Sequence, residues 1–327
     1  MSRSPNSYFY SNHTTVPIRD RPILTDIYER VDLFTPADGS VYILGTSVED
    51  RSVHSQEWEN KTSNVRFVRI FNETANAFSA QIDGHDRTIS LRSNRQLQQF
   101  WSTINPTTVY LDITGLSHHV WAPLLRTGLS IAPHLLGVYV EPADYRFSAT
   151  PTEGEIFDLS EKISGISPIP GFASLTEVAE QDVCFIPLLG FEGTRLAYIV
   201  EEVQPPGGKI VPVIGVPGFR VEYPFYSYHG NKSVLAETRA WRNVEFAAAN
   251  CPFSLYYLLE DIAAKHPRDL LKIAPIGTKP HALGAVLYAL TSRRRVEIVY
   301  DHPIRKAQRT LGTARLLVYH VSTFAHS

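Results

Sequence analysis

Thr278 and Lys279 could bind an anion, because they follow Gly277 where an expected strand turns directly into an expected helix. Glycine lets backbone N–H groups approach a ligand closely. The start of a helix adds unpaired N–H donors and the positive end of the helix dipole. Thr278 can cap that helix or donate to a phosphate, and Lys279 adds a formal charge. These residue types in this order predict an anion-binding loop.

Two arginines are further candidates for the same ligand. Arg195 follows the turn at 190–194, and Arg220 belongs to the aromatic segment 216–229, whose rings could stack on a base. Both segments follow expected strands, and ligands of open α/β sheets bind outside the carboxyl ends of strands. The alternative for segment 216–229 is a loop that packs as a lid or as a subunit interface.

A second polar cluster follows an expected strand in the first half of the chain. Thr114, Gly115 and Ser117 could contact the ligand there, and His118 or His119 could bind phosphate or act as a general acid or base. The alternative is that the histidines cap the helix and pack on its sheet. Adjacent histidines on a helix point about 100° apart, so they cannot share one metal ion. Without a metal-ligand spacing elsewhere, we expect no metal.

Basic residues are concentrated near the C-terminus. Residues 265–327 contain eleven Lys or Arg against three acidic residues, in a chain whose net charge is −2. Arg305, Lys306 and Arg309 in this segment could bind an anion or contact nucleic acid. The alternative is a solvated surface with scattered arginines, and the near-neutral whole chain argues against a general DNA-coating role.

Alternating strands and helices must position these residues. Strands are expected at 41–44, 65–70, 109–114, 135–140, 183–189, 209–215, 271–276, 296–300 and 315–321. Helices are expected at 93–101, 118–126, 195–202, 254–265 and 281–290. This order predicts an α/β fold of two Rossmann-like lobes with mostly parallel sheets. The last strand is expected to lie antiparallel at an edge.

The domain scheme follows from shifts in composition. We expect an N-terminal arm at 1–30, a first lobe at 31–145, an acidic Pro/Gly/Ser-rich connection at 146–180 and a second lobe at 181–327. The turns after the first and third strands of each half resemble each other, which favours an internal duplication. Alternating α/β folds resemble themselves by construction, so an unduplicated chain stays the alternative.

Residues 276–284, IGTKPHALG, resemble the strand–loop–helix signature of CARF domains, the Rossmann-like sensors of defence-associated nucleotide signals. Residues 112–115, DITG, are similar to the polar strand end of that family. The related SAVED domains hold two such units, whose loops, the resemblance implies, face each other and grip a cyclic oligonucleotide. The first half departs from the pattern, with LSHH at 116–119 in place of Gly-Thr-Lys. The sequence has no recognisable nuclease, protease or helix-turn-helix module, so the resemblance implies a separate effector chain.

Composition limits the remaining classes of protein. Hydrophobic residues make up 43% and charged residues 20%, which is typical of a globular chain and excludes a disordered one. There is no apolar run of roughly 18 residues for a membrane span. The polar N-terminus and two cysteines without a disulfide framework favour the cytoplasm. Neither GxGxxG nor GxxxxGK[ST] occurs, so we expect no dinucleotide cofactor.

The function that these observations favour is a sensor or regulatory protein for a nucleotide-type anion, acting on a separate protein partner in antiviral defence. It could form a homo-oligomer. One alternative is a hydrolase in the same cleft, with Lys279 stabilising charge and His118 or His119 as acid or base. Another is a subunit that contacts nucleic acid through its basic C-terminal segment.

Overall fold

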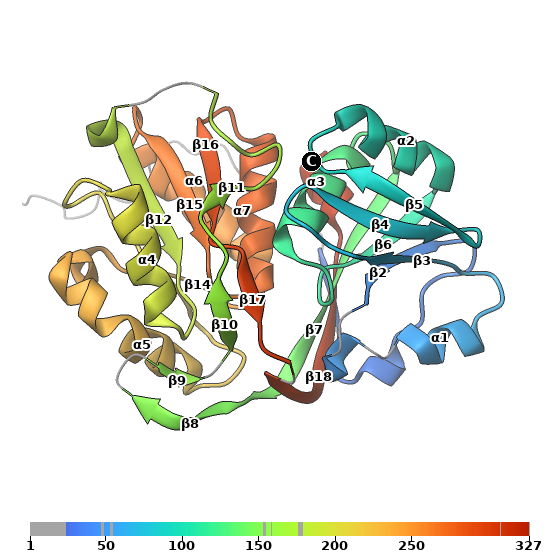
Figure 1. Cartoon of the computed structure of the whole chain (residues 1–327), viewed down its shortest axis with the longest axis horizontal. Helices are drawn as coiled ribbons and strands as arrows, with labels where there is room; N and C mark the ends of the chain where they lie inside the picture. Colours follow the sequence, from blue (N-terminus) through green and yellow to red (C-terminus); the bar gives the residue numbers. More distant parts are fainter. Residues whose placement is uncertain are drawn as a thin grey trace, which may run out of the picture.

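The computed structural model describes residues 24–46, 49–52, 55–152, 155–157, 159–175, 179–307 and 309–326. These residues form a mixed α/β structure of two lobes that lie side by side, each built on a sheet with parallel strands (Figure 1). Most of the expected N-terminal arm, residues 1–23, lies outside the described residues. Within the described part of the chain, no helix is both long and apolar enough to cross a membrane.

Lobe 1 contains an eight-stranded sheet with the order β1-β18-β7-β6-β2-β3-β4-β5. Its strands are β1 (Thr25–Tyr28), β2 (Val41–Gly45), β3 (Arg66–Phe71), β4 (Ala77–Ile82), β5 (His85–Ser90), β6 (Thr108–Asp112), β7 (His134–Tyr145) and β18 (Thr310–Tyr319). Its helices are α1 (Ser55–Lys61), α2 (Asn94–Ile104), α3 (His118–Gly128), α8 (Val321–Ala325) and the 3-10 helices η2 (Val31–Leu33) and η3 (Asp50–Ser52). The neighbours β7, β6, β2 and β3 are parallel, and the outer pairs are antiparallel.

Lobe 2 contains a six-stranded sheet with the order β11-β16-β15-β12-β13-β14. Its strands are β11 (Ser167–Pro168), β12 (Val183–Leu188), β13 (Val213–Gly215), β14 (Glu245–Ala247), β15 (Leu270–Pro275) and β16 (Val296–Tyr300). Its helices are α4 (Gly193–Val203), α5 (Tyr223–Glu237), α6 (Pro252–Lys265), α7 (Lys279–Thr291) and the 3-10 helices η4 (Glu180–Asp182) and η5 (Ala240–Asn243). All strands except the edge strand β11 are parallel to their neighbours.

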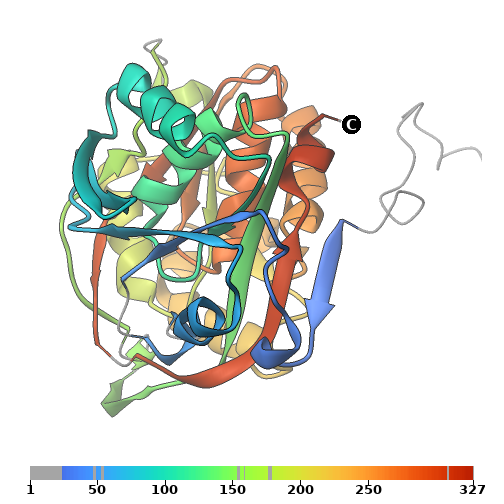
Figure 2. The same cartoon turned by 90° about the vertical axis from the view of Figure 1, so that its right-hand side faces the viewer.

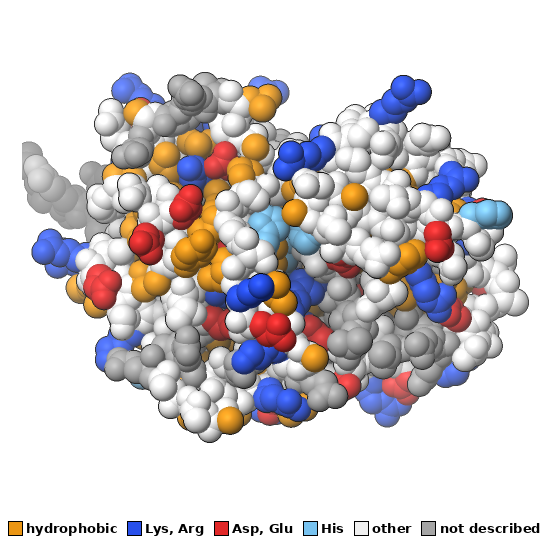
Figure 3. Space-filling model, in the orientation of Figure 1, with side chains coloured by type: hydrophobic (Ala, Val, Ile, Leu, Met, Phe, Trp, Pro, Cys, Tyr) orange, Lys and Arg blue, Asp and Glu red, His pale blue; other side chains and the backbone are white. Residues whose placement is uncertain are grey.

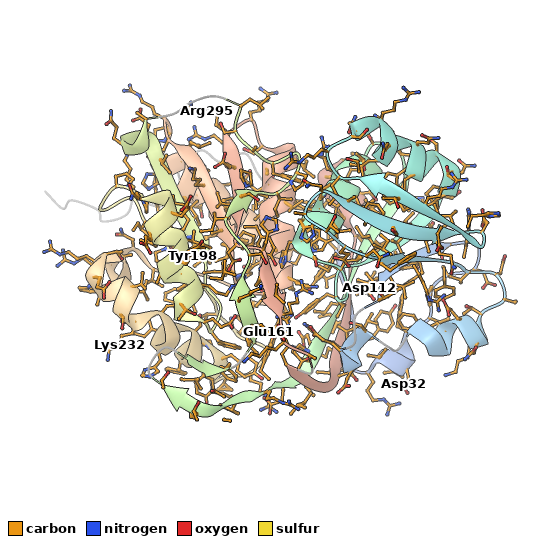
Figure 4. The ribbon with its side chains drawn as sticks, in the orientation of Figure 1. Asp32, Asp112, Glu161, Tyr198, Lys232 and Arg295 are labelled. Carbon is orange, nitrogen blue, oxygen red and sulfur yellow. The ribbon has the colours of Figure 1, made fainter. Side chains whose placement is uncertain are left out.

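A two-stranded ribbon lies between the lobes. It pairs β10 (Ser160–Ile163), from the connection, with β17 (Pro303–Arg305), which follows the last parallel strand of lobe 2. Figure 4 places Glu161 of this ribbon near the seam between the lobes. A second small sheet, β8 (Phe147–Thr152) with β9 (Glu155–Phe157), extends from the end of β7.

The sequence patterns explain why the regular elements form. All five residues of β2 are buried, as expected for an apolar strand inside a parallel sheet. In α2 the buried residues Leu97, Phe100, Trp101 and Ile104 recur at helical spacing, and the Ser93 side chain caps the helix by accepting from Gln96 N. These local signals account for the agreement between most expected and observed elements.

One expected boundary between the lobes differs from the observed one. Strand β18 was expected to close the second lobe at an edge, but it pairs antiparallel with β7 and is covered on its other side by β1 (Figure 2). Its residues 316–319 are fully buried, so the apolar run is satisfied inside the sheet of lobe 1. The expected second lobe at 181–327 therefore contributes an internal strand, next to the edge strand β1, to the sheet of the first.

One hydrophobic cluster contains side chains from both lobes. Helix α7 packs on its own sheet through Ala285 and Tyr288, while Leu283 and Leu287 belong to the same buried cluster as Leu124 of α3. A helix that is apolar on nearly all sides is buried on all sides. The lobes are therefore one packed body at α7, although each retains its own sheet.

The strand order of lobe 2 creates a position where two loops leave neighbouring strands in opposite directions. From β12 the chain moves outward to β13 and β14, and then returns through α6 to β15 on the other side of β12. Such a reversal opens a crevice at the carboxyl ends of the two strands. Here the loops pack backbone to backbone, because a Cβ on Gly277 would lie 2.4 Å from Leu189 O. In lobe 1, β2 and β6 form the corresponding reversal.

Segment 216–229 differs from the expected loop. Helix α5 begins at Tyr223, with a proline in its first turn, so only residues 216–222 remain irregular. The aromatic side chains of α5 do not recur along one face of the helix, so the sequence shows no helical periodicity there.

Candidate functional site

A cavity of about 100 Å³ lies where the carboxyl ends of the two sheets meet. Four helices begin at its wall, with His118, Arg195, Tyr223 and Lys279 in the first turns of α3, α4, α5 and α7. The helix starts therefore direct the positive ends of their dipoles toward this region. In the space-filling view, histidine and Lys/Arg side chains gather along the seam between the lobes (Figure 3).

Lobe 1 and its returning strand place a three-residue ion cluster at the cavity. Arg51 Nε and Arg309 Nε donate to the two carboxylate oxygens of Glu49, at 2.7 and 2.8 Å. Thr310 Oγ1 also donates to Glu49, and Arg51 Nη1 donates to the Tyr139 hydroxyl. Burial opposes ionisation of Glu49, but Arg51 and Arg309 hold the pKa of its carboxyl well below the ordinary value. One carboxylate thus serves two buried guanidinium groups.

Lobe 2 contributes a second ion pair. Arg195 Nε and Nη2 donate to the two oxygens of Asp301, at 2.6 and 2.7 Å, and Asp301 is completely buried. Arg195 Nη1 donates to Ile276 O at 3.1 Å, and Glu192 lies 3.6 Å from the same nitrogen. The bidentate geometry fixes the guanidinium. Arg195 lines the cavity, but its strongest donors already have a partner.

Lys279 joins the lobes instead of pointing freely at a ligand. Its Nζ donates to the carbonyl oxygens of Ile113, Thr114 and Leu116, at 2.5, 2.6 and 2.7 Å. Burial and the neighbouring Arg305 lower the pKa of Lys279, but the three carbonyl contacts hold the ammonium form, because only –NH₃⁺ has three N–H donors. Lys279 therefore supplies positive charge to the cavity, but its three N–H groups already have carbonyl partners, and direct contact between Lys279 and a ligand stays a prediction.

Arg305 is the arginine of the cavity without a carboxylate. In the described part of the chain, no carboxylate oxygen lies within ion-pair distance of its guanidinium, which instead contacts the Tyr300 hydroxyl. That hydroxyl lies 3.0 Å from His118 Nδ1. Burial, Lys279 and Arg305 lower the pKa of His118 well below its usual value, so the imidazole is neutral at pH 7. Arg305, Tyr300 and His118 form one polar chain along the wall.

Aromatic side chains form another part of the wall. Tyr145 packs edge-on against Phe191 and Tyr223, with ring centroids 5.2 and 5.6 Å apart, and Tyr139 packs against Phe219 at 6.0 Å. Burial raises the pKa of Tyr145 and of Tyr139, so both hydroxyls are uncharged donors. A cationic region with phenol hydroxyls beside aromatic rings is suited to an anion that carries an apolar or aromatic part.

Two other residues of the expected anion-binding loop lie at the wall of the cavity. Gly277 and Thr278 line the cavity, and the Thr278 side chain caps α7 by accepting from His281 N, as expected. Thr278 Oγ1 donates to Ala249 O, however, so its hydroxyl proton is not free for a phosphate. Pro280 at the start of α7 removes one further backbone donor.

The candidates from the first half lie behind the wall. Thr114 is fully buried, and its Oγ1 accepts from Val140 N. Gly115 packs against the backbone of Gly45, and Ser117 N donates to Glu73. None of the three is among the residues that line the cavity. They support the start of α3, where His118 alone reaches the cavity.

The remaining candidates point elsewhere. His119 faces His302 with ring centroids 5.3 Å apart, outside the cavity. Arg220 is half exposed and pairs with Asp144 and Glu222. Arg305 and Arg309 turn into the cavity, whereas Lys306 lines an outer groove, so the three do not form the continuous basic surface expected for nucleic acid.

Several residues of the site were not expected from the sequence. Glu49, Arg51 and Asp301 were not selected as site residues, although each follows an expected strand. Their position after β2 and β16 was the available signal, because both loops follow strands of the parallel sheets. Tyr139 and Tyr145 both lie in β7, and no motif in the sequence marks them as site residues. Among the described residues, no three His, Cys, Asp or Glu side chains gather as metal ligands.

No protein-family model matches the chain, and no curated protein sequence matches it either.

Proposed function

We propose that the protein binds a nucleotide-type anion in the cavity between its lobes and acts as a sensor that transmits occupancy to a separate protein partner. The observation that carries this proposal is the excess of buried positive charge around the cavity. Arg51, Arg195, Lys279, Arg305 and Arg309 face or adjoin the cavity, against the carboxylates of Glu49, Glu192 and Asp301. A protein does not gather unbalanced charge in a buried space without cost, and a bound anion removes that cost.

The starts of the helices also favour an anion in the cavity. Arg195 and Lys279 are cations in the first turns of α4 and α7, where the dipole disfavours positive charge. Each position costs a few tenths of a kcal/mol, roughly 0.3–1, in the absence of an anion. An anion in the cavity reverses the sign of this interaction.

The location between lobes supports a sensing role. Arg51 and His118 come from lobe 1, whereas Arg195 and Gly277 come from lobe 2. A ligand that contacts both lobes stabilises one arrangement of the two over others, and a partner that recognises this arrangement responds to the ligand.

The hydrolase alternative has less support from the geometry. Lys279 has no free donor for a developing charge. The nucleic-acid alternative needs exposed cations, whereas Arg309 keeps 13% of its side chain exposed.

An internal duplication would explain why the loops face each other. The strand order β3-β2-β6-β7 of lobe 1 corresponds to β13-β12-β15-β16 of lobe 2. In lobe 1, Gly45 at the end of β2 packs against Gly115, which follows β6. In lobe 2, Gly190, which follows β12, packs against Gly277, which follows β15. We propose that the two reversals are halves of one pseudo-symmetric site.

The test is ligand-dependent thermal unfolding of the full chain with sulfate, AMP, ADP, cyclic AMP and cyclic di-AMP. A ligand at a hundredfold excess over its Kd raises the midpoint by about 4 °C for a chain of this length. Arg305→Gln weakens binding by about 10- to 100-fold, because a charged hydrogen bond is lost. Arg220→Gln, whose side chain lies outside the cavity, is the matched control and leaves binding unchanged.

Chromatography of the ligand after incubation separates a sensor from an enzyme. Unchanged nucleotide supports the sensor, and consumption supports the hydrolase. If no anion shifts the midpoint at millimolar concentration, or if Arg220→Gln and Arg305→Gln have equal effects, the cavity is not the binding site.

A further inference from the structure

Two positive charges at the cavity, Lys279 and Arg305, have no carboxylate partner in the described residues. Among the described residues, the other charged groups that line the cavity, or form ion pairs with residues that line it, are Arg51, Arg195, Arg309, Glu49, Glu192 and Asp301. In this set three carboxylates balance three guanidinium groups. His118 and the cavity tyrosines are neutral at pH 7. The occupant that restores neutrality therefore carries two negative charges.

The size of the cavity limits what can carry those charges. Its volume of about 100 Å³ is smaller than a cavity of about 150 Å³ that holds one benzene molecule. A single tetrahedral group with its oxygens fits such a space, whereas a purine with its ribose does not. The two charges must therefore lie on one small group.

We propose, building on the function above, that the ligand is a phosphate monoester whose terminal phosphoryl group occupies this cavity. A terminal phosphoryl group carries a charge of about −1.5 to −2 at pH 7 and three acceptor oxygens. An internal phosphodiester, as in a cyclic oligonucleotide, carries one charge and needs two exits for its two ester arms. The phenol hydroxyls and the Arg305 guanidinium are donors of the kind that three oxygens require.

The organic part of the ligand can extend toward a neighbouring hollow. An outer groove of about 370 Å³ shares Glu192 and Arg195 with the cavity, and it is lined by Lys162 of β10. The Ser160 hydroxyl, also on β10, donates to Glu192 at 2.9 Å. The ribbon of β10 and β17 therefore stands between the two hollows, and the ester arm passes where this hydrogen bond now closes the wall.

Calorimetric titration of the full chain with AMP, cyclic AMP, cyclic di-AMP and sulfate tests the assignment. AMP and cyclic AMP share base and sugar and differ in the monoester, so we expect cyclic AMP to bind at least about tenfold more weakly at pH 7. Between pH 7 and pH 5 the AMP affinity falls about tenfold, because a monoester with a second pKa near 6 keeps about a tenth of its dianion. Sulfate is a dianion throughout this range, so a change in its affinity would come from titration of the protein itself. We expect the sulfate affinity to stay unchanged.

Each outcome separates the two proposals. Cyclic AMP or cyclic di-AMP that binds as tightly as AMP overturns the monoester but leaves anion binding intact. Failure of sulfate and of every nucleotide overturns the proposed function. Lys162→Gln weakens AMP several-fold and leaves sulfate unchanged; equal effects on both, or none on AMP, overturn the exit through the groove.

Discussion

Replacing Lys279 by methionine removes the ammonium that joins the lobes and keeps most of the side-chain volume. The three carbonyl oxygens of Ile113, Thr114 and Leu116 then lose their donor in a buried region. A buried acceptor left unpaired costs about 1–3 kcal/mol, so three of them cost roughly 3–9 kcal/mol. Burying the ammonium itself costs several kcal/mol, which the variant regains. The net loss of unfolding free energy is about 3 kcal/mol.

Urea unfolding followed by circular dichroism measures this loss. With an m value of about 3 kcal/mol/M, Lys279→Met lowers the midpoint by about 1 M at unchanged slope. Lys272→Met is the matched control, because Lys272 is partly exposed and lies 3.5 Å from Glu297, and it changes stability by less than about 1 kcal/mol. Equal midpoints for the two variants would refute the three-carbonyl clamp.

Two further predictions concern His281, which lies behind the site, and Gly277, which lies at its wall. His281 is fully buried with Nε2 3.0 Å from Ala248 O, and burial lowers its pKa to about 4, so the unfolded chain takes up a proton first as the pH falls below about 6.5. Between pH 6.5 and pH 4 the chain therefore loses about 3 kcal/mol of unfolding free energy through this group. We expect His281→Gln to make the melting temperature depend less steeply on pH in this range. An unchanged pH dependence would contradict the buried, neutral state of His281. Gly277→Ala places a Cβ 2.4 Å from Leu189 O, so we expect it to lower the melting temperature. The control Gly207→Ala adds a Cβ in open space and leaves the melting temperature unchanged. Equal melting temperatures for the two variants would contradict the close packing of the two loops.

The position of the cavity follows in part from patterns that the sequence contains. A strand that ends in Gly277 and continues into a helix predicts a capped helix start, and Thr278 caps it as expected. Helix α3 begins at His118, the first residue of the expected helix. Both features depend on residues within one or two turns of each other, so local spacing is enough to find them.

The partners of the charged residues could not be found in this way. Lys279 bonds to carbonyls more than 160 positions away in the sequence, and Arg309 meets Glu49 across 260 positions. A lysine next to a glycine is equally compatible with a phosphate and with three carbonyls, because both supply oxygen acceptors. Only the approach of the two lobes decides between them.

The sequence by itself determined the alternation of strands and helices, the helix caps and the presence of cations near strand ends, because these depend on local spacing and burial periodicity. The tertiary structure alone decided that β18 returns to lobe 1 and that α7 is shared between two sheets. It also decided which cations are left without a counter-ion. Charge balance in a buried space depends on every group within a few ångströms, whatever their distance along the chain.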